Sequence, residues 1–183
     1  MAETVRPQPI TIGGREFVWG RRTYIMGVVN VTSDSFSGDG LAYDVAGAVN
    51  QAVRMCRDGA DIIDVGGEST RPGFQPVAAD EEIRRTVPVI ERLLGEVDVP
   101  VSIDTYKAEV ARAALDAGVC LVNDVHGFRR EPEVAAVAAE FDVPAVAMHY
   151  QRDREFHDVI GDITTGLVES LRIARERGLP DER

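Results

Sequence analysis

Polar residues of chemically useful types recur directly after short apolar runs in this sequence. Asp104 and Asn123 stand at the ends of two successive runs of this kind. A carboxylate beside an amide suits a heterocycle edge with adjacent hydrogen-bond donors and acceptors, because the carboxylate accepts twice and the amide both donates and accepts. The two residues are therefore candidates for binding such a ring. The alternative for Asp104 is to cap a helix that begins near Tyr106.

Asn30 opens a polar segment, residues 30–40 (NVTSDSFSGDG), that follows the first apolar run. The side-chain oxygen of Asn30 is a neutral ligand for a hard cation. Phe36 is the single aromatic residue of the segment. A solvated loop with local turn hydrogen bonds is the alternative interpretation.

A second segment, residues 64–73 (DVGGESTRPG), overlaps the end of the next apolar run. Its two adjacent glycines let the backbone pass close to a ligand. Thr70 and Arg71 supply a hydroxyl and a guanidinium, and arginine favours bidentate recognition of carboxylate or phosphate. The segment is thus a candidate anion-binding loop. The alternative is a tight turn with Arg71 paired to Glu68 in solvent.

Strands and helices that alternate along the chain would bring these residues together. The apolar patterns predict strands at 24–31, 61–65, 99–104, 119–125 and 144–149, and helices at 44–57, 80–94, 107–117, 131–141 and 162–177. The first strand is an unbroken apolar run, which predicts burial on both faces. Pro88 predicts a kink or split near Thr86. A glycine pair between two alternating runs predicts a β-hairpin over residues 10–19.

The five βα units, residues 24–183, predict an α/β fold with a parallel sheet. Polar residues stand at nearly every strand end, as in a TIM (βα)8 barrel, whereas a doubly wound sheet gathers its site at one switch point. A complete barrel takes about 250 residues, and this chain has 183. We therefore expect one domain, residues 1–183, with the first five units of a barrel, either as a fragment or closed by a partner.

The excess of acidic side chains argues against nucleic acids and membranes as partners. There are 31 acidic and 20 basic side chains, which give a net charge of −11 and a pI near 4.7. Such a surface repels phosphate backbones and anionic lipid, so we expect no nucleic-acid or membrane partner. No apolar stretch approaches the roughly 18 residues of a spanning helix. Only two cysteines occur, Cys56 and Cys120, which indicates a reducing compartment and hence the cytoplasm.

Five stretches taken together resemble dihydropteroate synthase, a pterin-binding TIM-barrel family. They are residues 25–40 (IMGVVNVTSDSFSGDG), 61–73 (DIIDVGGESTRPG), 101–107 (VSIDTYK), 122–125 (VNDV) and 147–149 (AMH). The resemblance implies that 4-aminobenzoate condenses with (7,8-dihydropterin-6-yl)methyl diphosphate to give dihydropteroate and diphosphate in folate biosynthesis, with Mg²⁺ as cofactor. It also implies a homodimer for the full-length protein. Residues 1–183 alone are expected to be inactive, because the last three strands of the family carry part of its site.

The same resemblance implies roles for individual residues. The implied catalytic residues are Thr70, Arg71 and Asp104, which also bind substrate, and Asn30 is the implied metal ligand. The pterin ring is implied to lie against Asp104, Asn123, Val125 and Met148, with Phe36 closing over the aminobenzoate.

Two other functions share parts of this pattern. A pterin-dependent methyltransferase has the barrel and the carboxylate–amide pair, but it has no need for the segments 30–40 and 64–73. The second alternative function is a non-catalytic half-barrel that binds a pterin. The first segment also departs from the synthase pattern, because Ser33 replaces the usual proline and Asp39 is displaced by one position.

Overall fold

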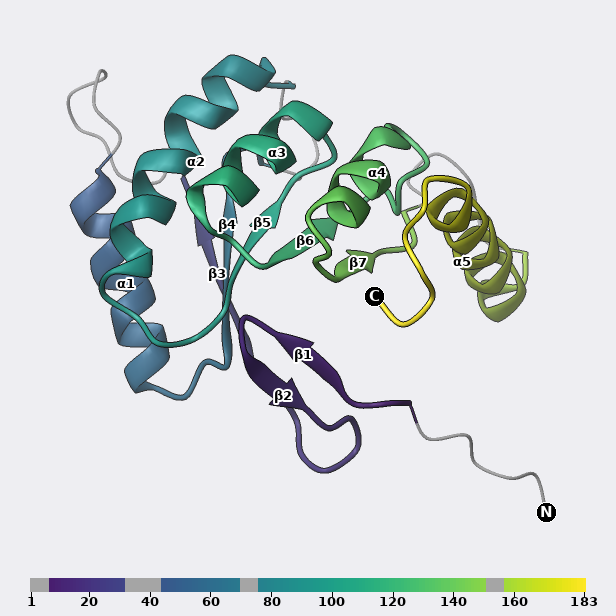
Figure 1. Ribbon diagram of the computed structural model, residues 1–183, viewed down its shortest axis with the longest axis horizontal. Helices are drawn as coiled ribbons and strands as arrows, with labels where there is room; N and C mark the ends of the chain where they lie inside the picture. Colours follow the sequence, from purple (N-terminus) through teal and green to yellow (C-terminus); the bar gives the residue numbers. More distant parts are fainter. Residues whose placement is uncertain (1–6, 32–43, 70–75, 151–156) are drawn as a thin grey trace.

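The chain folds as a short antiparallel hairpin followed by alternating strands and helices (Figure 1). The structure, a computed structural model, describes residues 7–31, 44–69, 76–150 and 157–183. Its strands are β1 (Ile10–Ile12), β2 (Arg15–Phe17), β3 (Met26–Asn30), β4 (Ile62–Gly66), β5 (Val101–Asp104), β6 (Leu121–Asp124) and β7 (Ala145–Ala147). Its helices are α1 (Val45–Arg57), α2 (Ala79–Leu94), α3 (Ala108–Ala117), α4 (Glu133–Glu140) and α5 (Val159–Glu176).

Strands β3 to β7 form one parallel sheet in which the spatial order follows the chain order. The predicted α/β class with a parallel sheet is confirmed. Because all five strands run the same way, their carboxyl ends meet at one edge of the sheet. The polar residues singled out in the sequence stand at this edge.

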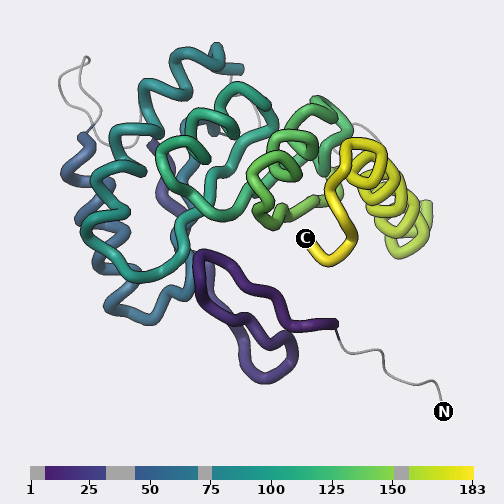
Figure 2. Tube along the Cα trace, in the orientation of Figure 1, coloured from purple at the N-terminus to yellow at the C-terminus, as the bar shows by residue number. Residues whose placement is uncertain are grey.

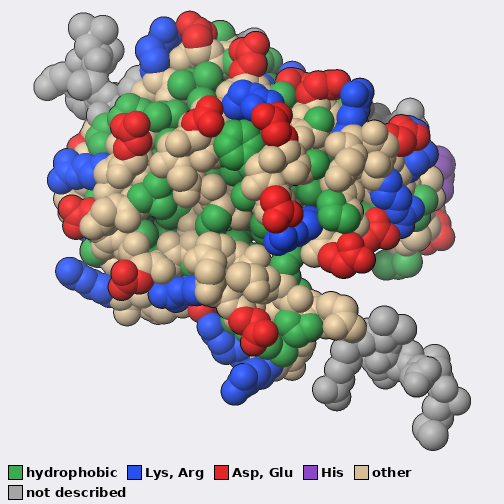
Figure 3. All heavy atoms as spheres, in the orientation of Figure 1, with side chains coloured by type: hydrophobic (Ala, Val, Ile, Leu, Met, Phe, Trp, Pro, Cys, Tyr) green, Lys and Arg blue, Asp and Glu red, His purple; other side chains and the backbone are tan. Residues whose placement is uncertain are grey.

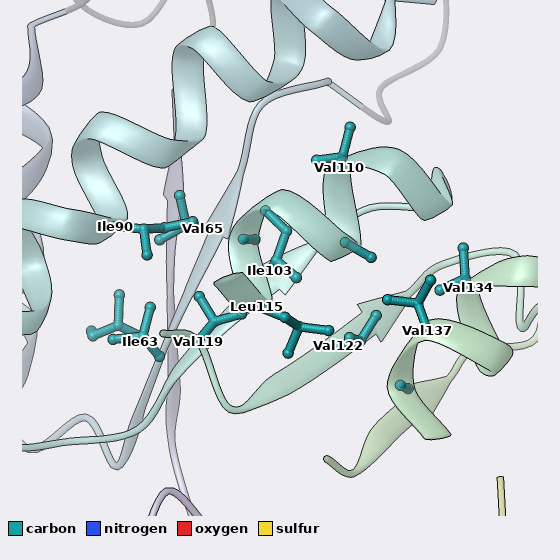
Figure 4. Close-up of a cluster of buried hydrophobic side chains, with 14 of the residues drawn as sticks. Ile63, Val65, Ile90, Ile103, Val110, Leu115, Val119, Val122, Val134 and Val137 are labelled. Atoms are coloured by element: carbon teal, nitrogen blue, oxygen red, sulfur yellow. The ribbon is translucent and has the colours of Figure 1, made fainter. Parts of the chain in front are cut away.

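The core lies between the sheet and its helices. Alternate strand residues point toward the helices, and Ile63, Val65 and Ile103 are completely buried there. Figure 4 shows them near Ile90 of α2 and Val110 of α3. This packing holds the strand ends in a fixed register, which is what a site built from several strands requires.

Within the described residues, no helix packs against the opposite face of the sheet, and this face is exposed at β3 and β7. Val28 of β3 is 43% exposed, whereas its neighbour Val29 is completely buried. The expectation that strand 24–31 is buried on both faces is therefore wrong for this chain. The physical reason is that the side chains of β3 alternate between faces, and within the described residues only one of these faces packs against helices.

The hairpin covers the end of the sheet where the strands begin, opposite the polar edge, and Figure 2 shows it apart from the helices. Strands β1 and β2 pair antiparallel around Gly13 and Gly14. A Cβ added at Gly13 would lie 2.7 Å from Cys120 Sγ. The turn therefore fits closely against the sheet only because this residue has no side chain.

Replacing Phe17 with Ala is expected to lower the free energy of unfolding by about 3 kcal/mol, as for other buried phenylalanines. Phe17 is almost completely buried and clusters with Ile62 and Leu121 at the beginnings of β4 and β6. Trp19→Ala is the control, because Trp19 is an exposed aromatic of the same segment. Urea unfolding measures both variants, and equal losses would contradict this packing role.

Helix α2 continues through Pro88 without a break, so the sequence-based alternative of a split near Thr86 is wrong, and the alternative of a kink stays a prediction. Pro88 removes one backbone N–H from the helix, but Val89, Ile90 and Leu93 directly after it are completely buried. Their packing against the sheet keeps the second half of the helix in place.

The surface fits the charge balance of the sequence. Figure 3 shows acidic and basic side chains interspersed over the face in view. Among the helices of the described ranges, none combines the length and the apolar character needed to cross a membrane.

Candidate functional site

Four residues form a row across the carboxyl ends of neighbouring strands. The register pairs Asn30 of β3 with Gly66 of β4, Gly66 with Asp104 of β5, and Asp104 with Asn123 of β6. As the sequence pattern predicts, Asp104 and Asn123 are direct neighbours. Three polar side chains and one glycine thus line the face of the sheet opposite the helices at this edge.

Gly66 leaves space between the two side chains beside it. A Cβ added at this position would lie 3.5 Å from Asn30 Oδ1 and 3.5 Å from Asp104 Oδ2. Any larger side chain at position 66 would therefore extend between these two oxygens. The glycine keeps this part of the row open to a ligand.

Asp64 completes the cluster, and the sequence analysis did not identify it. Its side chain is only 2% exposed, and it lies two residues before Gly66 on the same face of β4. Asp64 Oδ1 accepts a hydrogen bond from Ser102 Oγ at 2.5 Å, and Oδ2 accepts one from Asn123 Nδ2 at 2.9 Å. A carboxylate inside an apolar strand, as in the run 61–65 (DIIDV), is the sequence signal that could have identified it.

Burial and neighbouring negative charges dominate the electrostatics of the row. Burial is the main cause that raises the pKa of Asp104 to about 7, and the charges of Asp64, Glu82 and Asp124 add to it. Burial also raises the pKa of Asp64, against the hydrogen bonds from Ser102 and Asn123. Asp104 can therefore gain or lose a proton near neutral pH, which is unusual for an aspartate.

A buried ion cluster supports the backbone beside this row. Lys107 Nζ lies 2.7 Å from Glu68 Oε2 and also contacts Glu82 Oε2. Glu68 accepts two more hydrogen bonds, from Tyr106 Oη at 2.8 Å and from the Val77 N–H at 2.7 Å. The Glu68 carboxylate thereby joins both ends of segment 69–76 to the connection between β5 and α3. That connection begins directly after Asp104.

The ionisation of the cluster follows from these contacts. Burial alone would raise the pKa of Glu68, but the hydrogen bonds from Lys107, the Val77 N–H and Tyr106 hold that pKa below its ordinary value. Burial raises the pKa of Glu82, although Lys107 acts in the opposite direction. Lys107 is thus the cation that balances two partly or fully buried carboxyl groups.

Val125 is buried just after β6, whereas Met148 is exposed just after β7. Phe36, Thr70 and Arg71 lie outside the described residues.

Of the two structural alternatives, the helix cap by Asp104 fails, whereas the pairing of Arg71 with Glu68 lies outside the described residues. Asp104 does not cap α3, because the N–H of Ala108 in its first turn bonds to Glu131 Oε1 at 2.8 Å. The Glu68 carboxylate is not in solvent, because it accepts hydrogen bonds from Lys107, Tyr106 and the Val77 N–H.

In a comparison with known families, residues 26–183 match the model of a family described as pterin binding enzyme. Among curated relatives, the dihydropteroate synthase of Clostridium beijerinckii is 48% identical over 171 residues, covering 93% of this chain and 64% of its own length. The enzyme of Bacillus subtilis is 47% identical over 161 residues, covering 88% and 56%. The chain therefore spans less than two thirds of the length of these relatives.

Solved structures agree with this match. Dihydropteroate synthase of Xanthomonas albilineans, determined with 4-aminobenzoic acid, has a TM-score of 0.87 and 41% identity, covering 97% of this chain and 64% of its own. The Clostridium difficile enzyme, determined in the presence of pteroic acid, has a TM-score of 0.85 and 46% identity, covering 90% and 63%.

Proposed function

The chain belongs to the family of pterin-binding enzymes, and on that premise we propose that the protein containing it is a dihydropteroate synthase. The reaction joins the amino group of 4-aminobenzoate to the methylene carbon of (7,8-dihydropterin-6-yl)methyl diphosphate. A C–N bond forms, the C–O bond to diphosphate breaks, and the amine loses a proton. The observation that carries the proposal is the row of Asn30, Gly66, Asp104 and Asn123 at one sheet edge.

The row has the groups that this reaction needs on the pterin side. Asp104 and Asn123 present carboxylate and amide groups side by side, which match the donors and acceptors along the edge of a pterin ring. When Asp104 is ionised, its negative charge also stabilises positive charge that develops on the pterin as diphosphate departs. Val125, directly after β6, and Met148, directly after β7, are proposed to contact the apolar faces of the ring.

We propose that Phe36, Thr70 and Arg71 serve the other half of the reaction, as the family resemblance implies. Arginine and threonine side chains suit the carboxylate and diphosphate groups of the substrates. The buried ion cluster at Glu68 supports this role. Its hydrogen bonds to Val77 and Lys107 hold the two ends of the segment that contains Thr70 and Arg71.

The complete protein is proposed to form a TIM (βα)8 barrel, with residues 1–183 as its first five units. Two features of the sheet support this. The strands are parallel and follow the chain order, and apolar side chains such as Val28 and Val146 are exposed on the face opposite the helices. Three more strands would cover that face. We also propose a cytoplasmic homodimer, the state implied by the family resemblance.

Mg²⁺ is the proposed cofactor, and Asn30 its proposed ligand. No three His, Cys, Asp or Glu side chains of the described part of the chain converge as a metal site. Asn30 fits an ion that remains bound to substrate phosphates, because its side chain is exposed at the strand end and Mg²⁺ commonly keeps its waters and takes few protein ligands. When bound, the ion would offset charge on the diphosphate leaving group.

Replacing Asn30 with Ala is expected to raise the Mg²⁺ concentration for half-maximal rate by about tenfold, with little change in the KM for 4-aminobenzoate. The measurement is a Mg²⁺ titration of initial rates. Asn50→Ala is the matched control, because Asn50 is exposed on α1. An unchanged Mg²⁺ requirement in the Asn30 variant would exclude this residue as a ligand.

The direct test of the function is an assay of the complete protein with the two substrates, read as dihydropteroate and diphosphate in equal amounts. The same assay on residues 1–183 alone is expected to give no product. Product from the isolated chain would contradict the proposed dependence on further strands. Methyl transfer from a methylated pterin, with no condensation by the complete protein, would favour the methyltransferase instead.

A further inference from the structure

Asp64 is hydrogen-bonded to the side-chain amide of Asn123. It lies on the face of β4 opposite the helices, next to the row of strand-end residues, and it is almost completely buried. Each of its two carboxylate oxygens accepts one hydrogen bond, from Ser102 Oγ and from Asn123 Nδ2. The mechanism proposed above assigns it no role.

This contact fixes one of two possible orientations of the Asn123 amide. The two ends of an asparagine side chain have similar shape but opposite hydrogen-bonding character. The amide nitrogen of Asn123 donates to Asp64 Oδ2 at 2.9 Å, so the nitrogen end of the amide is the one that faces Asp64. The Asn123 oxygen, an acceptor, and the second N–H then remain for a ligand.

We propose that Asp64 is a positioning residue that sets the specificity of the site by holding the Asn123 oxygen toward the ligand. The proposal rests on the proposed function, because the ligand is taken to be a pterin. The 2-amino group of a pterin donates hydrogen bonds and matches an acceptor. A 2-oxo group at the same position would face the Asn123 oxygen with a second acceptor, which is unfavourable.

The test compares two probes, pterin (2-amino-4-oxopteridine) and lumazine (2,4-dioxopteridine), which differ in the group at C2 and in the hydrogen that lumazine carries on the adjacent N1. Their dissociation constants are measured by ligand fluorescence on the complete protein and on the variant Asp64→Asn. The wild type is expected to favour pterin by about 100-fold or more. In Asp64→Asn the Asn123 amide is free to turn, and the preference is expected to fall by about tenfold. A general structural defect would weaken both ligands and leave the ratio unchanged.

Glu82→Gln is the matched control. Glu82 is also a buried carboxylate whose charge acts on Asp104, but its hydrogen bonds go to Lys107 and Thr105 rather than to Asn123. This variant makes the same change of charge near the site and is expected to keep the wild-type ratio. A ratio that falls equally in both variants would assign the effect to charge and overturn the positioning role.

A second variant keeps the test decisive if Asp64→Asn does not fold. Asp64→Leu combined with Ser102→Ala removes the carboxylate and its hydroxyl partner together, so neither is left unpaired. The preference for pterin is expected to fall in this variant as well. A wild-type preference retained without Asp64 would overturn the inference alone. A wild type that does not favour pterin would contradict the proposed function as well as this inference.

Discussion

Replacing Asp104 with Asn is expected to lower kcat/KM of the complete protein by about 100- to 1000-fold, because the site loses a charged hydrogen-bond acceptor that faces the pterin. The same substitution is expected to make the unliganded fold more stable at neutral pH. Burial and the neighbouring carboxylates raise the pKa of Asp104 to about 7, so the folded protein resists its ionisation. A neutral amide of the same size has no charge to bury, so the cost of ionising residue 104 in the folded state is removed.

The sign of the pH dependence follows from this pKa. Between about pH 4, where an unfolded aspartate ionises, and the folded pKa of about 7, the folded state binds more protons than the unfolded state. The contribution of Asp104 to stability therefore falls as pH rises through this window. Urea unfolding at pH 5 and pH 7.5 is expected to show a stabilisation of Asp104→Asn by about 4 kcal/mol at the higher pH and by about a third of that at the lower.

The outcomes of this experiment separate function from stability. A variant that is inactive and more stable at pH 7.5 confirms that the protein holds a strained carboxylate in the site for its chemistry. Asp98→Asn is a suitable control, because Asp98 lies in the connection before β5 and away from the row. An Asp104→Asn variant less stable than the wild type at both pH values would contradict the electrostatic account.

The row at the sheet edge could be predicted from the sequence because parallel strands constrain it strongly. Once the apolar runs before Asp104 and Asn123 are taken as neighbouring strands, their polar ends must meet at one edge. The register of the structure places them opposite each other. Sequence motifs, rather than periodicity, connected this row with pterins.

Asp64 and Val28 show what the sequence pattern could not resolve. The carboxylate inside the apolar run 61–65 marks Asp64 as unusual, but nothing local indicates that its partners, Ser102 and Asn123, lie 38 and 59 residues further along the chain. Val28 has the composition of a buried strand, but its exposure depends on which elements cover the second face. Both features are set by tertiary contacts that no local window contains.

Replacing Lys107 with Met is expected to lower the free energy of unfolding by about 3–5 kcal/mol, the usual loss when one partner of a buried ion pair is removed. The Lys107 side chain is 12% exposed, and Glu82 beside it is 1% exposed. Without the ammonium group, Glu68 and Glu82 would face each other as two buried carboxyl groups, and one of them would have to take up a proton. Urea unfolding at pH 7.5 measures the loss.

Two comparisons identify the cause of that loss. Arg172→Met removes a cation with two carboxylate partners on the exposed surface of α5, and it is expected to leave stability nearly unchanged because solvent screens such pairs. Adding Glu82→Met to Lys107→Met is expected to recover part of the lost stability, since the uncompensated buried charge is then gone. If Lys107→Met alone were as stable as the wild type, the cluster could not be what fixes Glu68, and with it the two ends of segment 69–76, beside Asp104.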